Sequence, residues 1–433
     1  MSNPPLKIAI AGLGTVGGGV VKALSSRAGM LAEQAGRPLQ IVAAGARDPL
    51  KKRGFMVAGL TADTLSLAKG DADVVVELIG GEEGVARALV ETALENGKHV
   101  VTANKALLAR HGKALAEKAE SKGLQLKFEA AVAGGIPIVT TLREALIAHG
   151  VDAVKGILNG TCNYILTEME VTGRSFANVL ADAQAKGYAE ADPTLDVGGG
   201  DTAHKLALLS CLAFGTAPDL AAVRVEGIEH ITAADIRFAS EFGFRIKLLG
   251  VARQIAGVDG RFSIDQRVHP AMVRARTPLA NVDGAANGVV VDAGAAGTFF
   301  FSGRGAGEAP TASAVVADIV EIARGSYGPV FGRPAASLKP LAAADAEAMR
   351  SAFYLRFEVL DVPGVLAEIA GRLSDAGVSI ESMIQRGRAP GETVSIVMIT
   401  HEAAQTAIER ALKAIAGSDK VRARPCMIPM EAA

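Results

Sequence analysis

The stretch LKIAIAGLGTVG, residues 6–17, decides the fold of the first part of this chain. Its apolar first half predicts a buried strand, and the glycine pattern after it leads into a helical pattern. A strand, these glycines and a helix, in that order, form the context of the dinucleotide-binding fingerprint. The glycines let the backbone approach a pyrophosphate at a helix N-terminus, where free N–H groups and the helix dipole favour an anion. A tight turn in a structural α/β unit is the alternative. The residues predicted to bind the dinucleotide are Gly12, Gly14, Thr15, Val16 and Gly17.

The end of the second predicted strand indicates which dinucleotide binds. This strand covers Leu39 to Gly45 and is followed by Arg47 and Asp48. The adenosine ribose should arrive here, where an acid would hold a 2′-hydroxyl and an arginine accommodates a 2′-phosphate. Arg47 therefore predicts NADP, and Asp48 keeps NAD as the alternative. A solvated basic loop is the explanation without function.

Two further strand and helix units complete the pattern of this region. One predicted strand, residues 73–78, leads into Gly80, and the next, residues 98–101, leads into Thr102 and Lys105. This alternation predicts a Rossmann-type, doubly wound parallel sheet. Ligands bind such sheets at the carboxyl ends of the strands, so we expect Gly80, Thr102 and Lys105 at the cofactor. A lysine is an unusual choice at the positive end of a helix, which favours a functional role for Lys105 over a surface one.

A second stretch, GYAEADPTLDVGGGDTAHK at residues 187–205, gathers charged side chains. Proline and three glycines prevent a continuous helix before Asp201, so the earlier acids are expected on a loop. From Asp201 the pattern is helical and places Asp201 and Lys205 one turn apart on one face. Such a cluster suits a small zwitterionic substrate. Alternatively, Asp201 is an N-cap, Lys205 is its surface partner and the loop is solvated. The acids are Glu190, Asp192, Asp196 and Asp201.

The middle of the chain predicts a separate α+β domain. We assign residues 1–135 to the nucleotide domain and 136–304 to a catalytic, substrate-binding and dimerisation domain. The glycine-rich helix entry that ends at Gly307 should return the chain to the nucleotide domain at about residues 305–340, with Gly307 and Thr311 near the cofactor phosphates. The strands predicted in the middle domain are Ile246–Gln254, Arg261–Val268, Gly288–Asp292 and Thr298–Ser302.

The C-terminal residues 350–433 predict a small ferredoxin-like βαββαβ domain after a linker rich in proline and alanine. Its opening, DVPGVL from Asp361, resembles that of ACT domains, ligand-sensing modules that often bind amino acids. A purely structural dimerisation module is the alternative. The predicted elements are strand 353–360, helix 365–375, strand 379–385, strand 393–400, helix 403–415 and strand 420–426.

Composition excludes several classes of partner. The 433 residues carry a net charge of −1, with acids and bases interspersed, so nucleic acid and anionic membranes are not expected partners. Three widely spaced cysteines predict neither a disulfide framework nor a zinc site and fit a reducing compartment. The segment MSNPPLK has no signal-peptide pattern, and no apolar run reaches the length of a membrane span. We therefore expect a cytoplasmic protein.

The motifs together resemble one family. In order they are GLGTVG, TANK, GILNGTCNYIL, GYAEADPTLDVGGGDTAHK and GAGEAPTASAVVADI, followed by the ACT-like tail. This series resembles homoserine dehydrogenase over nearly the whole chain, and the 187–205 motif is far more specific than the nucleotide fingerprint. The resemblance implies reversible, NAD(P)-dependent interconversion of L-homoserine and L-aspartate 4-semialdehyde, on the route to threonine and methionine.

The resemblance also implies roles for individual residues. Glu190 and Asp196 would hold the substrate amino group, and Asp201 and Lys205 would lie near the reacting hydroxyl or carbonyl. Lys105 would complete the set beside the nicotinamide. Reducing an aldehyde needs a proton donor at the developing alkoxide, which a lysine can be, but the sequence does not decide between the two lysines. The residues expected to shape the pocket are Asn159, Gly160, Thr161 and Tyr188.

Three further expectations follow from the family. A monovalent cation such as sodium would be bound by the backbone carbonyls of Glu129, Val132, Gly134 and Ile136. An amino acid such as threonine would act through the ACT-like domain. The protein would be a homo-oligomer.

Two other functions were weighed. A phosphorylating semialdehyde dehydrogenase needs a thiolate nucleophile, for which Cys162 at a helix start is the candidate. A small packing cysteine is the simpler interpretation of that residue. A sensor that binds nucleotide and amino acid without turnover would have no need of Lys105 and Lys205 together.

Overall fold

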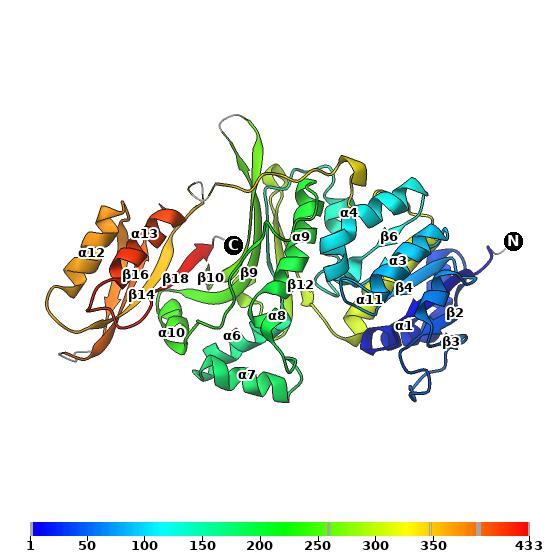
Figure 1. Ribbon diagram of the computed structural model, residues 1–433, viewed down its shortest axis with the longest axis horizontal. Coiled ribbons are helices and arrows are strands. Elements are labelled where there is room, and N and C mark those ends of the chain that lie inside the picture. The colour runs from blue at the N-terminus through cyan, green and yellow to red at the C-terminus, as the bar shows by residue number, and fades with distance from the viewer. Residues whose placement is uncertain (1–2, 258–259, 346, 348, 387–390, 432–433) are drawn as a thin grey trace.

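The computed structural model describes residues 3–257, 260–345, 347, 349–386 and 391–431. Three units follow one another along the molecule, with the N-terminal unit at one end, drawn in blue and cyan, and the C-terminal unit, in orange and red, at the other (Figure 1). The predicted C-terminal domain includes residues 387–390 and 432–433, and the expectation about a signal peptide includes residues 1–2. These positions lie outside the described residues.

The N-terminal unit is a Rossmann-type doubly wound sheet, as predicted. Its six strands are all parallel and run in the order β3-β2-β1-β4-β5-β6. Alternate residues of β1 face opposite layers, so that Ile8 packs with helices α1 and α11, and Ala9 packs with α3 and α4. The strands are β1 (Leu6–Ala11), β2 (Leu39–Gly45), β3 (Leu60–Thr61), β4 (Val74–Glu77), β5 (His99–Thr102) and β6 (Leu126–Lys127). The helices are α1 (Thr15–Ser26), α2 (Ala28–Ala35), η1 (Thr64–Ala68), α3 (Val85–Glu95), α4 (Lys105–Ser121) and α11 (Glu308–Ala323).

The three fingerprint glycines meet different steric demands at the turn from β1 to α1. Gly12 has φ +99°, a conformation that side chains rarely adopt. A Cβ on Gly17 would lie 1.9 Å from the carbonyl oxygen of Gly12, so the helix approaches the turn too closely for any side chain. A Cβ on Gly14 would meet nothing within 4 Å, which leaves open space above that backbone for a ligand.

The middle unit is a mainly antiparallel sheet covered by α6 and α9. The predicted strands are confirmed, and β9 and β10 are longer than expected because they form one continuous hairpin ladder. The strands are β7 (Ala153–Ile157), β8 (Arg224–Val225), β9 (Phe244–Ala256), β10 (Phe262–Arg274), β11 (Ala286–Asp292) and β12 (Thr298–Arg304). The helices are α5 (Ile138–Thr140), α6 (Gly160–Thr172), α7 (Phe176–Ala185), α8 (Thr194–Val197), α9 (Gly200–Phe214) and α10 (Ala233–Glu241). Short helical turns are η2 (Glu129–Ala131), η3 (Thr141–Ala145, a π-helix), η4 (Leu279–Asn281), η5 (Gly294–Ala296) and η6 (Ala335–Ser337).

One expectation about the acidic stretch is wrong. Asp196 does not lie on a loop but within the short helix α8, which begins directly after Pro193. Proline suits the start of a helix because its missing N–H has no partner there, and the glycines only separate α8 from α9. Helix α9 begins at Gly200, one residue before the predicted start. The result is two consecutive helices that bring Asp196 and Asp201 close together.

The C-terminal unit has the predicted βαββαβ order, and its last strand joins it to the middle unit. Strand β18 pairs antiparallel with β14 and parallel with β10, so one ten-stranded sheet, with β8 as a side branch on β10, runs through both units. The elements are β13 (Arg350–Ser351), β14 (Phe353–Leu360), α12 (Val365–Asp375), β15 (Ile380–Gln385), β16 (Thr393–Thr400), β17 (Ala403–Ala404), α13 (Gln405–Ala416) and β18 (Cys426–Glu431).

Two predicted boundaries in this unit are wrong. The last strand is β18, which begins at Cys426, where the prediction ended it. Residues before it touch β14 only through an isolated bridge at Val421, and Pro425, which has no N–H to donate, precedes the regular ladder. The helix predicted from Ala403 begins at Gln405, because Ala403 and Ala404 pair with β13.

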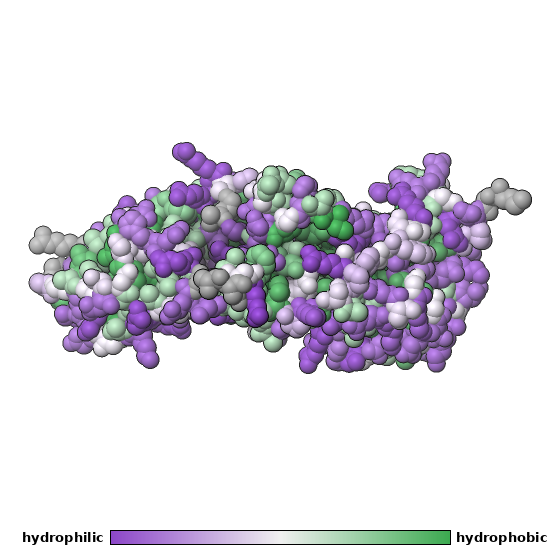
Figure 2. All heavy atoms as spheres, turned by 90° about the horizontal axis from the view of Figure 1, so that it is seen from above, coloured by the Kyte–Doolittle hydropathy of each residue, from purple (hydrophilic) through white to green (hydrophobic). Residues whose placement is uncertain are grey.

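The surface of the N-terminal unit is mostly hydrophilic, whereas hydrophobic residues reach the surface over the middle of the molecule (Figure 2). In the described part of the chain, no helix is both long enough and apolar enough to cross a membrane.

Candidate active site

A cavity of about 530 Å³ is lined by residues of the N-terminal and middle units. It brings together residues that the sequence places far apart, from the fingerprint turn, the start of α4, the start of α6, the acidic stretch and the entry to α11. The predicted site residues that line it are Val16, Lys105, Gly134, Gly160, Thr161, Tyr188, Asp196, Asp201, Lys205, Gly307 and Thr311.

Asp201 lies between two lysines at the wall of this cavity. Lys205 Nζ is 2.7 Å from Asp201 Oδ2, and Lys105 Nζ is 3.2 Å from Asp201 Oδ1. The spacing of four residues on α9 sets the first contact, and the start of α4 supplies the second. Lys205 Nζ also donates a hydrogen bond to the Leu158 carbonyl at 2.6 Å. The Lys205 side chain is 12% exposed and that of Lys105 is 33% exposed, so both ammonium groups lie in or beside the cavity.

The ionised form of the Asp201 carboxyl is strongly favoured over the protonated form. Burial by itself would raise the pKa of this carboxyl, but attraction to Lys205 and Lys105 and hydrogen bonds from Lys205 and Asn159 lower the pKa well below its ordinary value. Asp201 is therefore a fixed negative charge that holds two ammonium groups near one point.

Asn159, which was expected to shape the pocket, also connects the two acids, a role that the sequence did not indicate. Its Nδ2 donates to Asp196 Oδ1 at 2.7 Å and to Asp201 Oδ2 at 2.9 Å, while its Oδ1 accepts from the Cys162 N–H and so caps α6. The only signal in the sequence was an asparagine at a helix start, which is the ordinary mark of an N-cap. Burial raises the pKa of Asp196, and the charge of Asp201 adds to this, against the hydrogen bond from Asn159.

Of the other residues predicted to bind or enclose the substrate, Thr161 and Tyr188 line the cavity and Glu190 does not. The Thr161 hydroxyl donates to the Tyr188 carbonyl at 2.8 Å, and the Tyr188 ring stacks on Tyr164 with 4.6 Å between ring centroids. These contacts fix one side of the cavity opening. Glu190 is exposed and is not one of the described residues that line the cavity.

Glu77, the last residue of β4, was not predicted as part of the site. It holds together the backbone at the edge of the sheet where the cofactor is expected. It is fully buried and accepts hydrogen bonds from the N–H groups of Ile79 and Gly80 and from the Thr102 hydroxyl. Gly80 has φ +82°, and Thr102 is buried with its hydroxyl on Glu77. An acid at the end of the apolar run VVVE was the available signal.

Arg47 is exposed just after β2. Asp48, which kept NAD as an alternative, uses Oδ1 to accept the N–H groups of Leu50 and Lys51 at 3.0 and 3.2 Å. This oxygen stabilises the local turn. Both residues are exposed at the place where the ribose is expected, but an oxygen of the aspartate is already engaged in the turn.

The segment expected to bind a cation is a buried turn. Gly134 and its neighbour Ala133 both have φ +54°. The Glu129 carboxylate accepts the N–H groups of Val139 and Thr140, which holds the turn against α5. The Glu129 carbonyl accepts from the Val132 N–H at 3.4 Å and the Ile136 carbonyl from the Ile138 N–H at 2.8 Å, each with a second lone pair available. Among the described residues there is no cluster of His, Cys, Asp and Glu that could hold a metal.

Cys162 lies beneath the site as a packing residue. It is fully buried, and its Sγ donates to the Asp196 carbonyl at 3.2 Å. Burial raises the pKa of the thiol well above its ordinary value, and the charges of Asp196 and Asp201 add to this. A thiol held protonated in this way is unsuited to nucleophilic attack.

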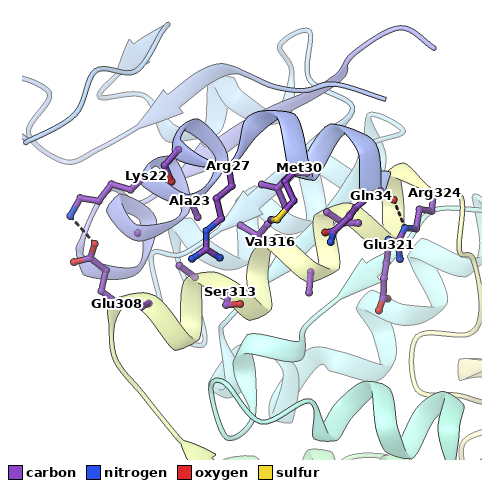
Figure 3. A pocket seen from close by; sticks show the side chains of 17 residues that line it. Lys22, Ala23, Arg27, Met30, Gln34, Glu308, Ser313, Val316, Glu321 and Arg324 are labelled. Carbon is purple, nitrogen blue, oxygen red and sulfur yellow. Dashed lines mark hydrogen bonds and ion pairs between the residues drawn. The ribbon is translucent and has the colours of Figure 1, made fainter. Parts of the chain in front are cut away.

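A second groove of about 530 Å³ lies between α1, α2 and α11, away from the predicted site residues. Lys22 and Glu308 form an ion pair of 2.7 Å at one end, and the Arg324 guanidinium donates to the Gln34 carbonyl at the other (Figure 3). Its floor is formed by small and apolar side chains such as Val316. It contains no acid–lysine cluster like the one at Asp201, so we place the chemistry in the first cavity.

Comparison with known families agrees with this choice. Three family profiles match consecutive parts of the chain: the NAD-binding domain of homoserine dehydrogenase over residues 12–129, homoserine dehydrogenase over residues 137–320, and the ACT domain over residues 353–417. Asp201 and Lys205 lie in the part of the chain that matches the homoserine dehydrogenase profile, and Lys105 lies in the part that matches its NAD-binding domain.

Individual relatives extend over the whole chain. A homoserine dehydrogenase of Pseudomonas aeruginosa is 44% identical over 95% of both chains, and one of Neisseria gonorrhoeae is 43% identical over 99% of both. The crystal structure of a homoserine dehydrogenase from Thiobacillus denitrificans superposes with a TM-score of 0.93 at 41% identity and covers 100% of both chains. A hyperthermophilic archaeal homoserine dehydrogenase in complex with NADPH, 22% identical with a TM-score of 0.63, shares the fold over 75% of this chain and 99% of its own.

Proposed function

Because this chain belongs to the homoserine dehydrogenase family, we propose how its residues carry out the reaction of that family. The chain is an NAD(P)-dependent oxidoreductase that acts on the CH–OH group of L-homoserine and interconverts it with L-aspartate 4-semialdehyde. The observation that carries the assignment of residues is the buried Asp201 between the ammonium groups of Lys105 and Lys205.

The two lysines handle the proton of the reacting oxygen. Oxidation of homoserine removes a proton from its hydroxyl and a hydride from the carbon that carries it. The bound nicotinamide supplies the hydride chemistry. A lysine within hydrogen-bond reach of the oxygen takes the proton in this direction as a neutral amine, and in the other direction it returns the proton to the developing alkoxide as an ammonium group. Asp201 positions both lysines, and we assign the transfer to Lys205 because it is the more enclosed of the two.

The substrate amino group binds at the acidic side of the cavity. Asp196 lines it, and Asn159 holds one of its two carboxylate oxygens in place. The other oxygen is the acceptor that we assign to the ammonium group. Glu190 lies close enough to raise the pKa of Asp196 through its charge and would add to the attraction from outside the cavity.

NADP is the proposed dinucleotide. Gly12, Gly14, Thr15, Val16 and Gly17 would hold the pyrophosphate at the start of α1, and the entry to α11 with Gly307 and Thr311 would face it. The exposed Arg47 is available for a 2′-phosphate, while Asp48 already binds two backbone N–H groups. The archaeal relative was solved with NADPH, which supports the same choice.

The remaining proposals concern ions, effectors and assembly. A monovalent cation such as sodium would lie among the carbonyls of Glu129, Val132, Gly134 and Ile136, one of which, Gly134, lines the cavity. An amino acid such as threonine would bind the ACT domain of a homo-oligomer. Three buried, unpaired cysteines agree with work in the reducing cytoplasm.

Initial rates test these assignments. Turnover of homoserine is followed by the absorbance of the reduced nicotinamide, with NADP or NAD, for the wild type, for Arg47→Ala and for the neighbouring control Lys52→Ala. We expect Arg47→Ala to lower kcat/KM with NADP by roughly tenfold or more, as for loss of a charge-assisted hydrogen bond, and to leave that with NAD nearly unchanged. Absence of turnover with both cofactors would overturn the reaction. An unchanged cofactor ratio in Arg47→Ala would overturn the NADP assignment alone.

A further inference from the structure

Asn287 is a buried amide at the wall of the active-site cavity. It lies on β11, opposite Gly303 of β12, is 1% exposed and lines the cavity. Neither its Oδ1 nor its Nδ2 has a hydrogen-bond partner within the described part of the chain. Buried amides are nearly always paired, because each unpaired end carries a desolvation cost. Both ends of the amide are covered in the ligand-free protein, so a partner from the cavity reaches them when the Gly305 turn that packs against the amide shifts.

The backbone packs so closely against the Asn287 amide that glycine is required there. A Cβ on Gly305 would lie 2.1 Å from both the Cγ and the Nδ2 of Asn287, so only glycine lets the chain pass over the amide. A Cβ on Gly134 would in turn lie 2.3 Å from the Gly305 carbonyl oxygen. Gly305, Ala306 and Gly307 all line the cavity and lead into α11. The amide thus lies beside the glycine-rich entry that we assign to the cofactor.

We propose that Asn287 binds the carboxamide of the nicotinamide ring and so fixes which face of the ring meets the substrate. The proposal rests on the proposed function. The amide offers an acceptor and a donor side by side, and both are unpaired, so the matching ligand group must also donate and accept. A carboxamide does both. The carboxylate of homoserine only accepts and its ammonium group only donates, so either would leave one end of Asn287 unpaired.

The decisive experiment measures binding without turnover. Dissociation constants of NADP⁺ and of its 3-acetylpyridine analogue, in which a methyl group replaces the carboxamide NH₂, are determined by calorimetry for the wild type and for Asn287→Leu. We expect the wild type to bind NADP⁺ more tightly than the analogue. In Asn287→Leu, NADP⁺ should bind about tenfold more weakly and the preference over the analogue should fall to near one. An unchanged preference would overturn the proposal.

Thermal unfolding of the ligand-free protein separates this role from a structural one. Replacing an unpaired buried amide with an apolar side chain should leave Tm unchanged or higher. The matched control is Asn163→Leu, because the Asn163 amide donates to the carbonyls of Val282, Gly284 and Ala286. That variant should lower Tm and keep the preference for NADP⁺. If Asn287→Leu lowered Tm to the same extent and kept the preference, Asn287 would be structural.

A second variant changes Gly305, the residue that packs against the Asn287 amide. Gly305→Ala should displace the Asn287 amide and weaken NADP⁺ binding. Combining it with Asn287→Ala relieves the steric conflict, but the loss of binding should remain. Recovery in the double variant would mean that Asn287 only fills space. A change confined to the KM of homoserine would assign Asn287 to the substrate instead. A wild type that binds NADP⁺ but does not oxidise homoserine would overturn the reaction, while the binding comparison would still test Asn287.

Discussion

Two buried aspartates in this molecule are held by cations, and they differ in what surrounds them. Asp201 meets Lys205 and Lys105 at the wall of a cavity. Asp235, on α10, is fully buried where the middle unit meets the C-terminal unit, and it accepts from the Arg356 Nε at 2.6 Å and the Tyr354 hydroxyl at 3.0 Å. In both cases attraction and hydrogen bonds overcome burial and lower the pKa of the carboxyl.

The difference lies in the cations and in access to the cavity. A guanidinium keeps its proton and binds a carboxylate in a fixed geometry, whereas an ammonium group exchanges its proton. At Asp235, Arg356 and the capping residue Thr232 use both carboxylate oxygens, which ties α10 to β14. At Asp201, the ammonium groups border open space. One site joins two units, and the other is the site to which we assign proton transfer.

Replacing Lys205 should produce the largest change. Lys205→Met is expected to lower kcat by roughly 10² to 10⁴, the usual contribution of a general acid or base, while NADP binding is kept. Lys205→Arg is the matched control, since it keeps the charge beside Asp201 but does not give up its proton at working pH. Steady-state kinetics of both variants check this. Wild-type kcat in Lys205→Arg would transfer the role to Lys105.

Asp235→Ala should act on stability instead. It leaves the buried Arg356 without its main partner, and breaking a buried ion pair costs about 3–5 kcal/mol of unfolding free energy. Urea unfolding measures the loss, and the specific activity of the folded fraction should stay near that of the wild type. The double variant Asp235→Leu with Arg356→Met should recover much of the stability. A lasting deficit there would show that the charges themselves are needed.

Lowering the pH should reduce the contribution of both aspartates to the stability of the protein. Because the folded-state pKa of each aspartate is depressed, each contributes stability that is present above the ordinary aspartate pKa of about 4 and is lost as pH falls through the folded-state pKa. Unfolding free energies measured from pH 6 down to pH 3 should therefore fall less steeply in Asp201→Asn and in Asp235→Asn. Equal slopes in wild type and variants would contradict the lowered pKa values.

Cys162→Ser should have the smallest effect. Its thiol is buried and its pKa is raised, so it takes no part in proton transfer or attack. We expect kcat/KM for homoserine within about twofold of the wild type, as for a conservative change at a residue that does not react. Loss of activity with an unchanged Tm would revive a thiolate mechanism.

The local elements followed well from the sequence, and the wrong boundaries have local causes. Regular strands and helices were found wherever periodicity and glycine punctuation agreed, as in β1 and α1. The strand misplaced at residues 420–426 and the loop expected at Asp196 both lie beside a proline, whose effect depends on where the chain goes next. Glu77, Asn287 and the bridging role of Asn159 were not recognised, because a single polar residue in an apolar or capping pattern carries no signal of its partners.

The sequence by itself determined the type of domains, their order, the family and the candidate site residues, because these are written in short motifs that fold locally. Only the tertiary structure decided which of those side chains meet. Lys105 and Asp201 come from different helices, α4 and α9, and their contact depends on how the N-terminal and middle units pack. The same holds for β18, which pairs with strands of two units. Contacts between distant segments depend on the packing of whole units, and no short stretch of sequence encodes that packing.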